Sequence, residues 1–117
     1  MTEHFPDYEL ECNCGCGLMN MSKNFLNTLE IARKLADVPF TINSASRCEK
    51  HNKVEGGKAT SSHLTGYAVD IATSSSRGRF KILESLISVG FARIGIANNF
   101  IHVDVDPVKS QEVSWIY

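Results

Sequence analysis

The sequence lacks a long apolar run, an excess of basic residues and an amino-terminal leader pattern. No stretch approaches the roughly 20 apolar residues that a membrane-spanning helix needs, so we expect no membrane insertion. The formal net charge of -1 offers no basic surface for nucleic acid, which is therefore not an expected partner. Because no basic segment is followed by an apolar one, no secretory signal is visible. We expect a monomeric protein that is synthesised in the cytoplasm.

The sequence does have the composition of one globular domain. Hydrophobic residues make up 43% and charged residues 21% of the 117 residues, as in ordinary globular proteins. A chain of this length can bury one hydrophobic core, but a second core is not expected. Since no repeat, low-complexity tract or linker interrupts the chain, we predict a single domain over residues 1–117.

Hydrophobic periodicity predicts two main helices. The first follows Ser22, which is a suitable N-cap, runs over residues 23–37 and is stopped by Pro39. Its apolar stripe consists of Phe25, Leu26, Leu29, Ala32, Leu35 and Ala36. The second helix runs over residues 76–90 and ends at a glycine. Its expected packing residues are Phe80, Leu83, Leu86 and Ile87.

Alternating apolar and polar residues predict four strands. They cover residues 40–44, 67–72, 92–96 and 100–105. Asn98-Asn99 provides a hairpin turn before the last strand. Residues 1–20 are expected to be irregular, and residues 46–62 to form a long loop of the kind that usually carries function. The order helix, strand, strand, helix, strand, strand predicts an α+β fold, with a small, largely antiparallel sheet and two main helices packed on it.

The last strand has an apolar face and a polar face, because side chains two residues apart on a strand share a face. The core face carries Ile101, Val103 and Val105. The other face carries Phe100, His102, Asp104 and Asp106. This arrangement places an imidazole beside carboxylates on a face that we expect to open to solvent.

The strand over residues 67–72 repeats this arrangement around Asp70, which lies opposite the apolar face and between two alanines. His63 precedes it in the loop that enters the strand, and Gly66 lets the chain turn toward the sheet. If the two strands pair, His63, Asp70 and His102 can converge. Two imidazoles and one carboxylate form a three-ligand set suited to catalytic zinc, with the fourth position left for water.

Residues 61–70, which read Ser-Ser-His-Leu-Thr-Gly-Tyr-Ala-Val-Asp, match the motif S-x-H-x-x-G-x-A-x-D. On this motif the sequence resembles the family of zinc D-alanyl-D-alanine carboxypeptidases. That family includes phage endolysins that cut the L-alanyl-D-glutamate bond, and it is related to VanX-type dipeptidases and to the amino-terminal domain of hedgehog proteins. Residues 100–104 are similar to its second signature, H-x-D on a late strand. Residues 44–57 are similar to the segment before the first metal ligand, so the resemblance covers nearly the whole chain.

The resemblance implies a zinc ion on His63, Asp70 and His102 and a substrate in the stem peptide of bacterial peptidoglycan. It implies that Arg47 binds a carboxylate or carbonyl of that peptide, a task that suits a guanidinium group. It also implies that Ser61 orients or hydrogen-bonds groups near the metal. Tyr67 lies inside the motif and either lines the substrate cleft or is an ordinary half-buried strand residue.

Two positions depart from the pattern of the family, and the first is Ala45, where the family often has glycine. Many relatives carry an acidic general base three residues before the last metal histidine, and this position is Asn99 here. An amide cannot accept a proton from water. Asp104, on the same face as His102, is the best substitute, and it is either the catalytic base or a group that orients a metal ligand.

The sequence has four cysteines. Cys12, Cys14 and Cys16 lie in one short run, and Cys48 is distant from them. The C-x-C-x-C spacing is not that of a zinc knuckle. For a cytoplasmic product we favour free buried thiols. A disulfide that involves Cys48 and a four-thiolate structural metal site are the alternatives. Trp115 and Tyr117 either form a cleft wall or close the core.

These patterns predict a zinc peptidase that hydrolyses a peptide bond of the stem peptide with metal-activated water. Asp104 and Arg47 are the candidate catalytic residues beside the metal. A zinc-bearing cell-wall binding module that has lost catalysis is one alternative, and a dipeptidase that acts on small D-amino-acid peptides is another. The expected place of action is the cell wall, with a bacterial source or a phage source that releases the enzyme at lysis or carries it in the virion.

Overall fold

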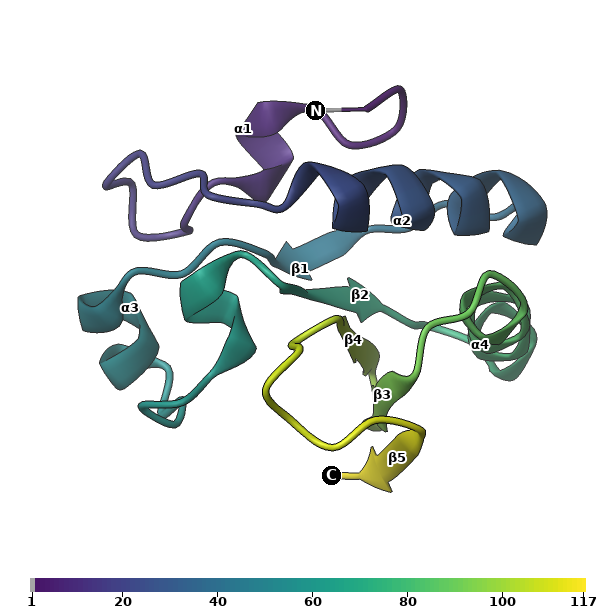
Figure 1. The fold of residues 1–117 in the computed structure, drawn as a ribbon. Helices are drawn as coiled ribbons and strands as arrows, with labels where there is room; N and C mark the ends of the chain where they lie inside the picture. Colours follow the sequence, from purple (N-terminus) through teal and green to yellow (C-terminus); the bar gives the residue numbers. More distant parts are fainter. Residues whose placement is uncertain (1) are drawn as a thin grey trace.

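A computed structural model describes residues 2–117 and confirms the predicted α+β fold (Figure 1). Its helices are α1 (Asp7–Leu10), α2 (Lys23–Ala36), α3 (Glu49–Val54) and α4 (Ser76–Ser88), with a 3₁₀ turn η1 (Ser62–Thr65). Its strands are β1 (Ile42–Ser44), β2 (Ala68–Ala72), β3 (Arg93–Ile96), β4 (Phe100–Asp104) and β5 (Val113–Ile116). No helix in the described part of the chain is long and apolar enough to cross a membrane.

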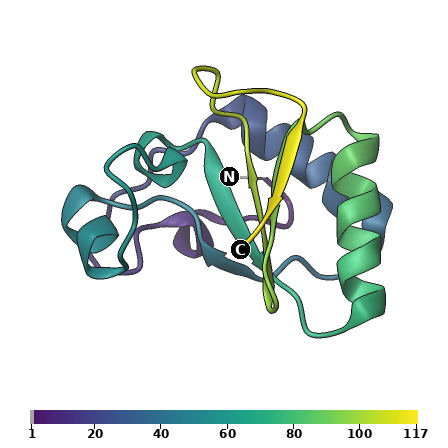
Figure 2. The same cartoon turned by 90° about the horizontal axis from the view of Figure 1, so that it is seen from below.

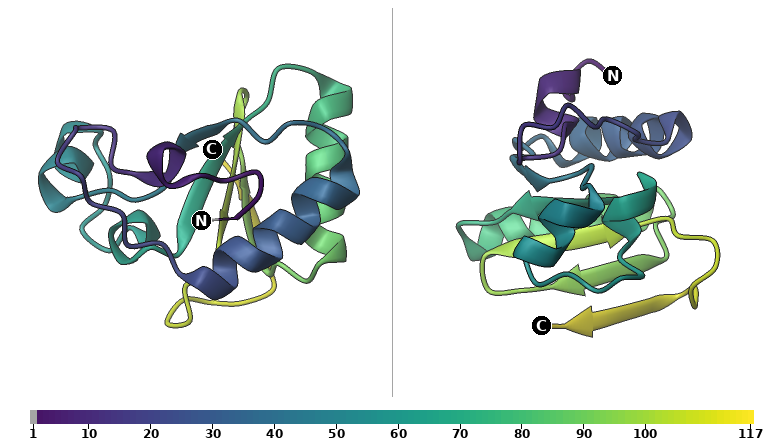
Figure 3. Two further views of the ribbon diagram at one scale, coloured as in Figure 1. Left: turned by 90° about the horizontal axis from the view of Figure 1, so that it is seen from above. Right: turned by 90° about the vertical axis from the view of Figure 1, so that its left-hand side faces the viewer.

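The five strands form one sheet in the order β1-β2-β4-β3-β5. Neighbouring strands are antiparallel except β3 and β5, which are parallel. Figure 3 shows the strands in this order, with the amino-terminal segment beside β1 and β5 at the opposite edge. In Figure 2 the strands lie between α4 on one side and α3 on the other. The core is therefore built between the sheet and the two long helices, and the other side of the sheet is left for the short elements.

The two long helices begin and end where local chemistry predicts. The Ser22 hydroxyl accepts a hydrogen bond from the N–H of Phe25, which caps α2. Asp37 ends this helix with a left-handed φ of 54°, two residues before the proline. Ser75 caps α4 in the same way through the N–H of Gly78. The helices pack through narrow stripes that belong to one hydrophobic cluster.

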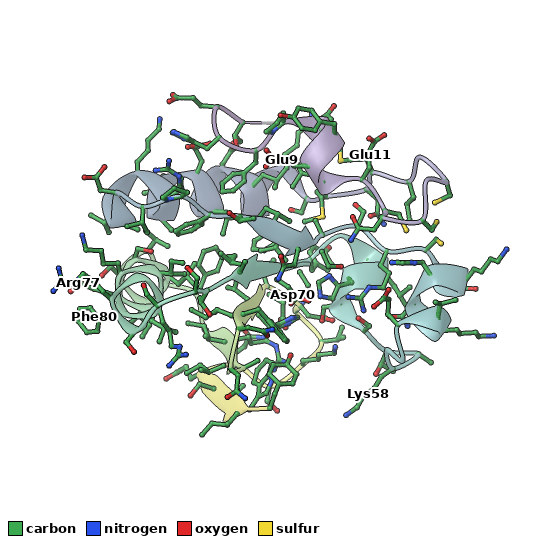
Figure 4. All side chains as sticks on the ribbon, turned by 180° about the vertical axis from the view of Figure 1, so that it is seen from behind. Glu9, Glu11, Lys58, Asp70, Arg77 and Phe80 are labelled. Carbon is green, nitrogen blue, oxygen red and sulfur yellow. The ribbon has the colours of Figure 1, made fainter. Side chains whose placement is uncertain are left out.

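The predicted packing faces of the helices are wrong at three residues. Leu35, Phe80 and Ile87 are 59%, 63% and 64% exposed, and Phe80 points outward from α4 in Figure 4. The buried residues of α4 are Leu86, which was predicted, and Ile82 and Ser85, which were not. A helix that lies on a sheet and touches one other helix buries only a narrow stripe, so apolar residues at its borders remain in solvent.

The two predicted irregular segments contain short helices. Residues 46–62 include α3 and the first residue of η1, and residues 1–20 include α1. These helices are too short to show a hydrophobic period, and tertiary contacts hold them. The strand β5 was also missed, because its four residues are mostly exposed and pair with β3 rather than with β4, the strand before it in the chain. The first predicted strand is shorter than expected and begins at Ile42.

One transverse row of residues crosses the whole sheet. Ser44 pairs with Asp70, Asp70 with His102, His102 with Gly95, and Gly95 with Trp115. Residues that are paired across strands point to the same face and lie close together. The register alone therefore brings Asp70 and His102, which are 32 residues apart in sequence, to the same place on the sheet.

The apolar face of β4 is confirmed, but the expectation that its polar face opens to solvent is wrong. Ile101 and Val103 are fully buried in the core. His102 and Asp104, on the other face, are only 8% and 2% exposed. The cover comes from β5, because the ring of Trp115 lies 5.6 Å from that of His102, measured between centroids. A β-carbon at Gly95 would lie 2.5 Å from the Nε1 atom of Trp115, so the glycine makes room for this contact.

The turn that enters β2 should be sensitive to a single methyl group. Gly66 has a φ of 79°, and a β-carbon there would lie 2.0 Å from the backbone oxygen of Asn20. We expect Gly66→Ala to lower the free energy of unfolding by about 3–5 kcal/mol, because left-handed strain adds to a clash with backbone. The measurement is equilibrium unfolding in denaturant.

Gly56→Ala is the matched control. Gly56 has a similar φ of 73°, but no atom would lie within 4 Å of an added β-carbon. This variant should lose only about 1–2 kcal/mol, the cost of the left-handed conformation. Equal losses in the two variants would contradict the close approach of Asn20 to Gly66.

Candidate functional site

Three side chains that the sequence analysis predicted as metal ligands meet above the sheet. Asp70 comes from β2, His102 from β4 and His63 from the turn η1. The Nε2 atom of His63 lies 3.3 Å from Oδ2 of Asp70, and the Nδ1 atom of His102 lies 2.9 Å from Oδ1 of Asp70. Asp70 is labelled in Figure 4, where it lies in the middle of the molecule. The carboxylate therefore stands between the two imidazoles.

A hydrogen bond fixes which nitrogen of His63 is free, and a carboxylate faces each ring nitrogen of His102. The Nδ1–H of His63 donates to the carbonyl oxygen of Ala45 over 2.9 Å, which leaves Nε2 free to bind a metal. The Nε2 atom of His102 lies 2.7 Å from Oδ2 of Asp104. If that nitrogen carries the proton, Nδ1 of His102 is free on the side of Asp70. Second partners of this kind set the orientation of metal-binding histidines.

The electrostatics of the site favour a positive charge beside Asp70. Burial alone would raise the pKa of Asp70, but hydrogen bonds from His102 and His63 outweigh it and hold that pKa well below its usual range. Burial alone would lower the pKa of His102, but the carboxylates of Asp104 and Asp70 raise it. A group of two imidazoles and two carboxylates therefore retains a cation, either a proton or a metal ion.

The donor set fits a zinc ion. The candidate ligand atoms of His63, Asp70 and His102 all lie within 4.8 Å of one another. A tetrahedral ion with bonds of about 2.0–2.1 Å separates its ligands by about 3.3–3.4 Å. The separation of 3.3 Å between Nε2 of His63 and Oδ2 of Asp70 is close to that value, and Nδ1 of His102 lies on the other oxygen of the same carboxylate. Two nitrogens and one oxygen leave one tetrahedral position for a water or a substrate.

Asp104 lies beyond His102, and both of its oxygens have partners. Oδ2 contacts His102, and Oδ1 accepts a hydrogen bond from Nε of Arg93 over 2.7 Å and another from the N–H of Asp106 over 3.1 Å. Burial alone would raise the pKa of Asp104, but these contacts, that with His102 first, lower it. Arg93 also stacks on Trp115, with its guanidinium carbon 5.0 Å from the centre of the ring. The carboxylate is therefore ionised and held in place.

A cavity of about 290 Å³ opens beside Asp70. It is lined by Asn13, Asn43, Ser44, Arg47, His51, Glu55, Asp70, Asn99 and Phe100. Most of these side chains are polar, and several can donate hydrogen bonds. The pocket thus offers amide, hydroxyl and guanidinium groups next to the candidate metal ligands, as a peptide-binding site would.

Arg47 is held at the edge of this pocket. Its guanidinium donates to Oδ1 of Asn52 and to Oγ of Ser44, both over 3.0 Å, and lies 3.9 Å from Oδ2 of Asp70. Its Nε is buried and has no hydrogen-bond partner among the described residues. A β-carbon at Gly57 would lie 2.0 Å from Oδ1 of Asn52, so a glycine is needed for the Asn52 side chain to reach Arg47.

The other candidate residues of the motif do not line the pocket. The Ser61 hydroxyl accepts a hydrogen bond from the N–H of His63 over 3.3 Å and so caps the turn that carries this ligand. Tyr67 is half-buried at the entry to β2. Sequence reasoning did not place His51 and Glu55 in the site, although α3 brings both to the pocket and they form a 3.5 Å pair. The one available signal was their spacing of four residues, which puts both on one face of a helix.

The four cysteines form a second cluster. All are free thiols, with Cys12 buried, Cys14 and Cys16 exposed and Cys48 half-buried. The expectation of free buried thiols is therefore wrong for two of the four. The sulfur atoms of Cys12, Cys14 and Cys48 lie 3.5–3.8 Å apart, well beyond the ~2.05 Å of a disulfide bond. The alternative of a disulfide to Cys48 is thus not what the structure contains.

The cluster favours an ionised sulfur. Burial alone would raise the pKa of Cys12, but backbone N–H groups of Cys14 and Cys48 outweigh it and lower the pKa to about 6. The backbone N–H of Cys16 favours the Cys14 thiolate, but the neighbouring sulfurs of Cys16 and Cys12 outweigh it and raise the pKa of Cys14 to about 12. The thiolate is therefore favoured at Cys12 and disfavoured at Cys14 unless a cation joins the two sulfurs.

Comparison with known proteins gives one family. A family model described as Peptidase M15 matches residues 3–104, which include all the candidate metal ligands and Arg47. No curated protein matches the chain. The match ends before β5, so the strand that covers His102 lies outside it.

The contact between Asp104 and His102 predicts a loss of metal affinity. We expect Asp104→Asn to weaken zinc binding at the His63, Asp70 and His102 group by about 10- to 100-fold, because the His102 imidazole loses the carboxylate that orients it. The measurement is competition against a chelator, with thermal unfolding to show that the variant folds.

Asp106→Asn is the matched control for this substitution. Asp106 is also buried, but its carboxylate accepts from the Ser62 hydroxyl and from the N–H of Val108 and has no contact with His102. Its zinc affinity should stay close to that of the parent. Parent affinity in Asp104→Asn would show that the carboxylate does not orient the ligand.

Proposed function

Because the chain belongs to the peptidase M15 family, a family of metallopeptidases, we propose that it is a zinc peptidase that hydrolyses a peptide bond in the stem peptide of bacterial peptidoglycan. The observation that carries the proposal is that His63, Asp70 and His102 converge beside a polar pocket that also contains Arg47. Its place of action is then the cell wall.

His63, Asp70 and His102 would hold the zinc ion, and because Asp70 also lines the pocket, a bound ion would lie next to it. When bound, zinc lowers the pKa of a water molecule from about 15.7 to about 7 and polarises a carbonyl oxygen. His63 and His102 would each supply one ring nitrogen, and a partner on the other ring nitrogen orients each imidazole. Ala45 and Asp104 thus fix the geometry of the site before substrate arrives.

We assign Asp104 to this positioning role in preference to that of the general base. Its two oxygens are taken by His102, Arg93 and Asp106, and it is not among the residues that line the pocket. Asn99 does line the pocket, but its amide cannot take a proton. His51 and Glu55 are the remaining titratable side chains along the described pocket wall that could accept one.

Arg47 supplies the recognition of the substrate. Stem peptides carry carboxylates, and a guanidinium group binds a carboxylate through paired hydrogen bonds. Each terminal nitrogen of the Arg47 guanidinium gives one N–H to Asn52 or Ser44 and keeps a second N–H for the substrate. The amides of Asn13 and Asn43 add further donors and acceptors for peptide groups.

Asn99 favours a second candidate function, that of a zinc-bearing wall-binding module. A pocket without an acidic residue at this position would keep affinity for the stem peptide and lose the proton transfer that hydrolysis requires. Such a protein binds sacculi and releases no peptide. Activity on defined substrates distinguishes the two functions.

The test is incubation of the zinc-loaded protein with purified sacculi and defined muropeptides, with products identified by mass. We expect new amino and carboxyl ends at one bond of the stem peptide. His63→Ala should abolish their release, because a ligand is lost. His4→Ala is the control, since His4 pairs with Glu30 outside the site. Binding of sacculi without any product would support the binding module and contradict the peptidase.

A second prediction concerns Arg47. We expect Arg47→Lys to lower kcat/KM by roughly 10- to 100-fold, mostly through a higher KM, because lysine keeps the charge but loses hydrogen bonds to a charged group. Arg79→Lys is the control, because its Nε is also buried and unpartnered but it lies on α4 and does not line the pocket. Zinc content is measured in both variants. An unchanged KM in Arg47→Lys would remove the arginine from substrate binding.

A further inference from the structure

We propose that Cys12, Cys14, Cys16 and Cys48 bind a second zinc ion, separate from the candidate catalytic site, and that this ion is structural. The four sulfur atoms lie within 4.8 Å of one another. This site shares no residue with the His63, Asp70 and His102 group, so it stands or falls independently of the peptidase activity.

The spacing of the sulfurs is that of a tetrahedral ion. With Zn–S bonds of about 2.3 Å, tetrahedral sulfurs lie about 3.8 Å apart. The separations are 3.5 Å for Cys12 and Cys14, 3.8 Å for Cys12 and Cys48, and 3.6 Å for Cys14 and Cys48. These separations are too long for a disulfide bond and close to the spacing of sulfurs that share one zinc ion.

The backbone around the cluster is arranged for thiolates. The N–H of Cys48 points at the sulfur of Cys12, and the N–H of His51 at the sulfur of Cys48, each over 3.4 Å. The Cys48 sulfur thereby caps α3. Gly15 and Gly17 have φ values of 86° and 84°, and these left-handed turns on either side of Cys16 fold the short run back on itself. Three cysteines at alternate positions can thus face a fourth one.

A four-thiolate set points to structure rather than to catalysis. It fills all four positions of a tetrahedral zinc ion and leaves none for water or substrate. Residues 13–17 of the loop are exposed, and a hydrogen bond from the N–H of Cys12 to the carbonyl oxygen of Leu18 closes its base. In Figures 1 and 3 this loop extends from the end of α1 toward α3 and returns to the start of α2. The ion would fasten the loop to the start of α3.

A zinc ion on the four cysteines would also affect the shape of the pocket beside Asp70. Cys48 directly follows Arg47, and Asn13 lies between two of the cysteines. Both Arg47 and Asn13 line the pocket, and the Asn13 amide donates to the carbonyl oxygen of Asn43 over 2.8 Å. The second ion would therefore join the two segments that form one wall of the candidate active site.

The experiment measures zinc per chain in protein purified under reducing conditions. We expect two equivalents in the parent, one in Cys14→Ser/Cys16→Ser, one in His63→Ala and none in the combined variant. Replacement of zinc by cobalt gives a second readout, because only thiolate ligands produce a strong sulfur-to-cobalt charge-transfer absorption. That absorption should persist in His63→Ala and vanish in the double cysteine variant. Asn13→Ala, a control within the same loop, should keep two equivalents.

Alkylation of the native parent keeps the proposal testable if the cysteine variants do not fold. The four thiols should be protected from iodoacetamide in the zinc-loaded protein and become reactive after chelation. Rapid alkylation of zinc-loaded protein, a disulfide found by mass, or iron in place of zinc would overturn the proposal. A loss of zinc in the cysteine variant with none in His63→Ala would keep this site and contradict the proposed catalytic one.

Discussion

The antiparallel register of β2 and β4 pairs Asp70 with His102, and every other part of the candidate site is arranged around that pair. Side chains alternate along a strand, so a slip of one residue would turn Asp70 into the core and bring Val69 to the other face. Val69 and Ile71 prevent the slip, because both are fully buried and would be exposed by it. The hydrophobic core on one face of the sheet thus positions the polar groups on the other.

The segment after β1 connects the remaining parts of the site. The carbonyl oxygen of Ala45 orients His63, and the N–H of Arg47 donates to the carbonyl oxygen of His63 over 3.2 Å. A metal ligand and the arginine at the pocket edge are therefore tied together through backbone atoms. Backbone contacts of this kind are insensitive to side-chain identity, which explains how a loop can hold catalytic groups at fixed positions.

The two candidate metal groups differ in a way that matches their surroundings. The His63, Asp70 and His102 group lies on the sheet, where packing already fixes each ligand, and it leaves one position open beside the pocket. The cysteine group lies in a loop with little apolar burial, where a closed set of ligands would itself supply the order. In the first group the fold holds the ligands in place, and in the second the bound ion would hold the loop in place.

The sequence by itself determined the two long helices, the first four of the five strands, the apolar faces of β2 and β4, and the identity of the side chains that meet at Asp70. These features rest on caps, periodicity and motifs within a few residues, which the chain carries locally. Only the tertiary structure decided that Trp115 covers His102 and that Asp104 contacts Arg93 and His102. It also decided that His51 and Glu55 line the pocket, and that Cys48 lies beside the amino-terminal cysteines. Each of these depends on which distant segments become neighbours, and that is set by packing of the whole chain rather than by any local pattern.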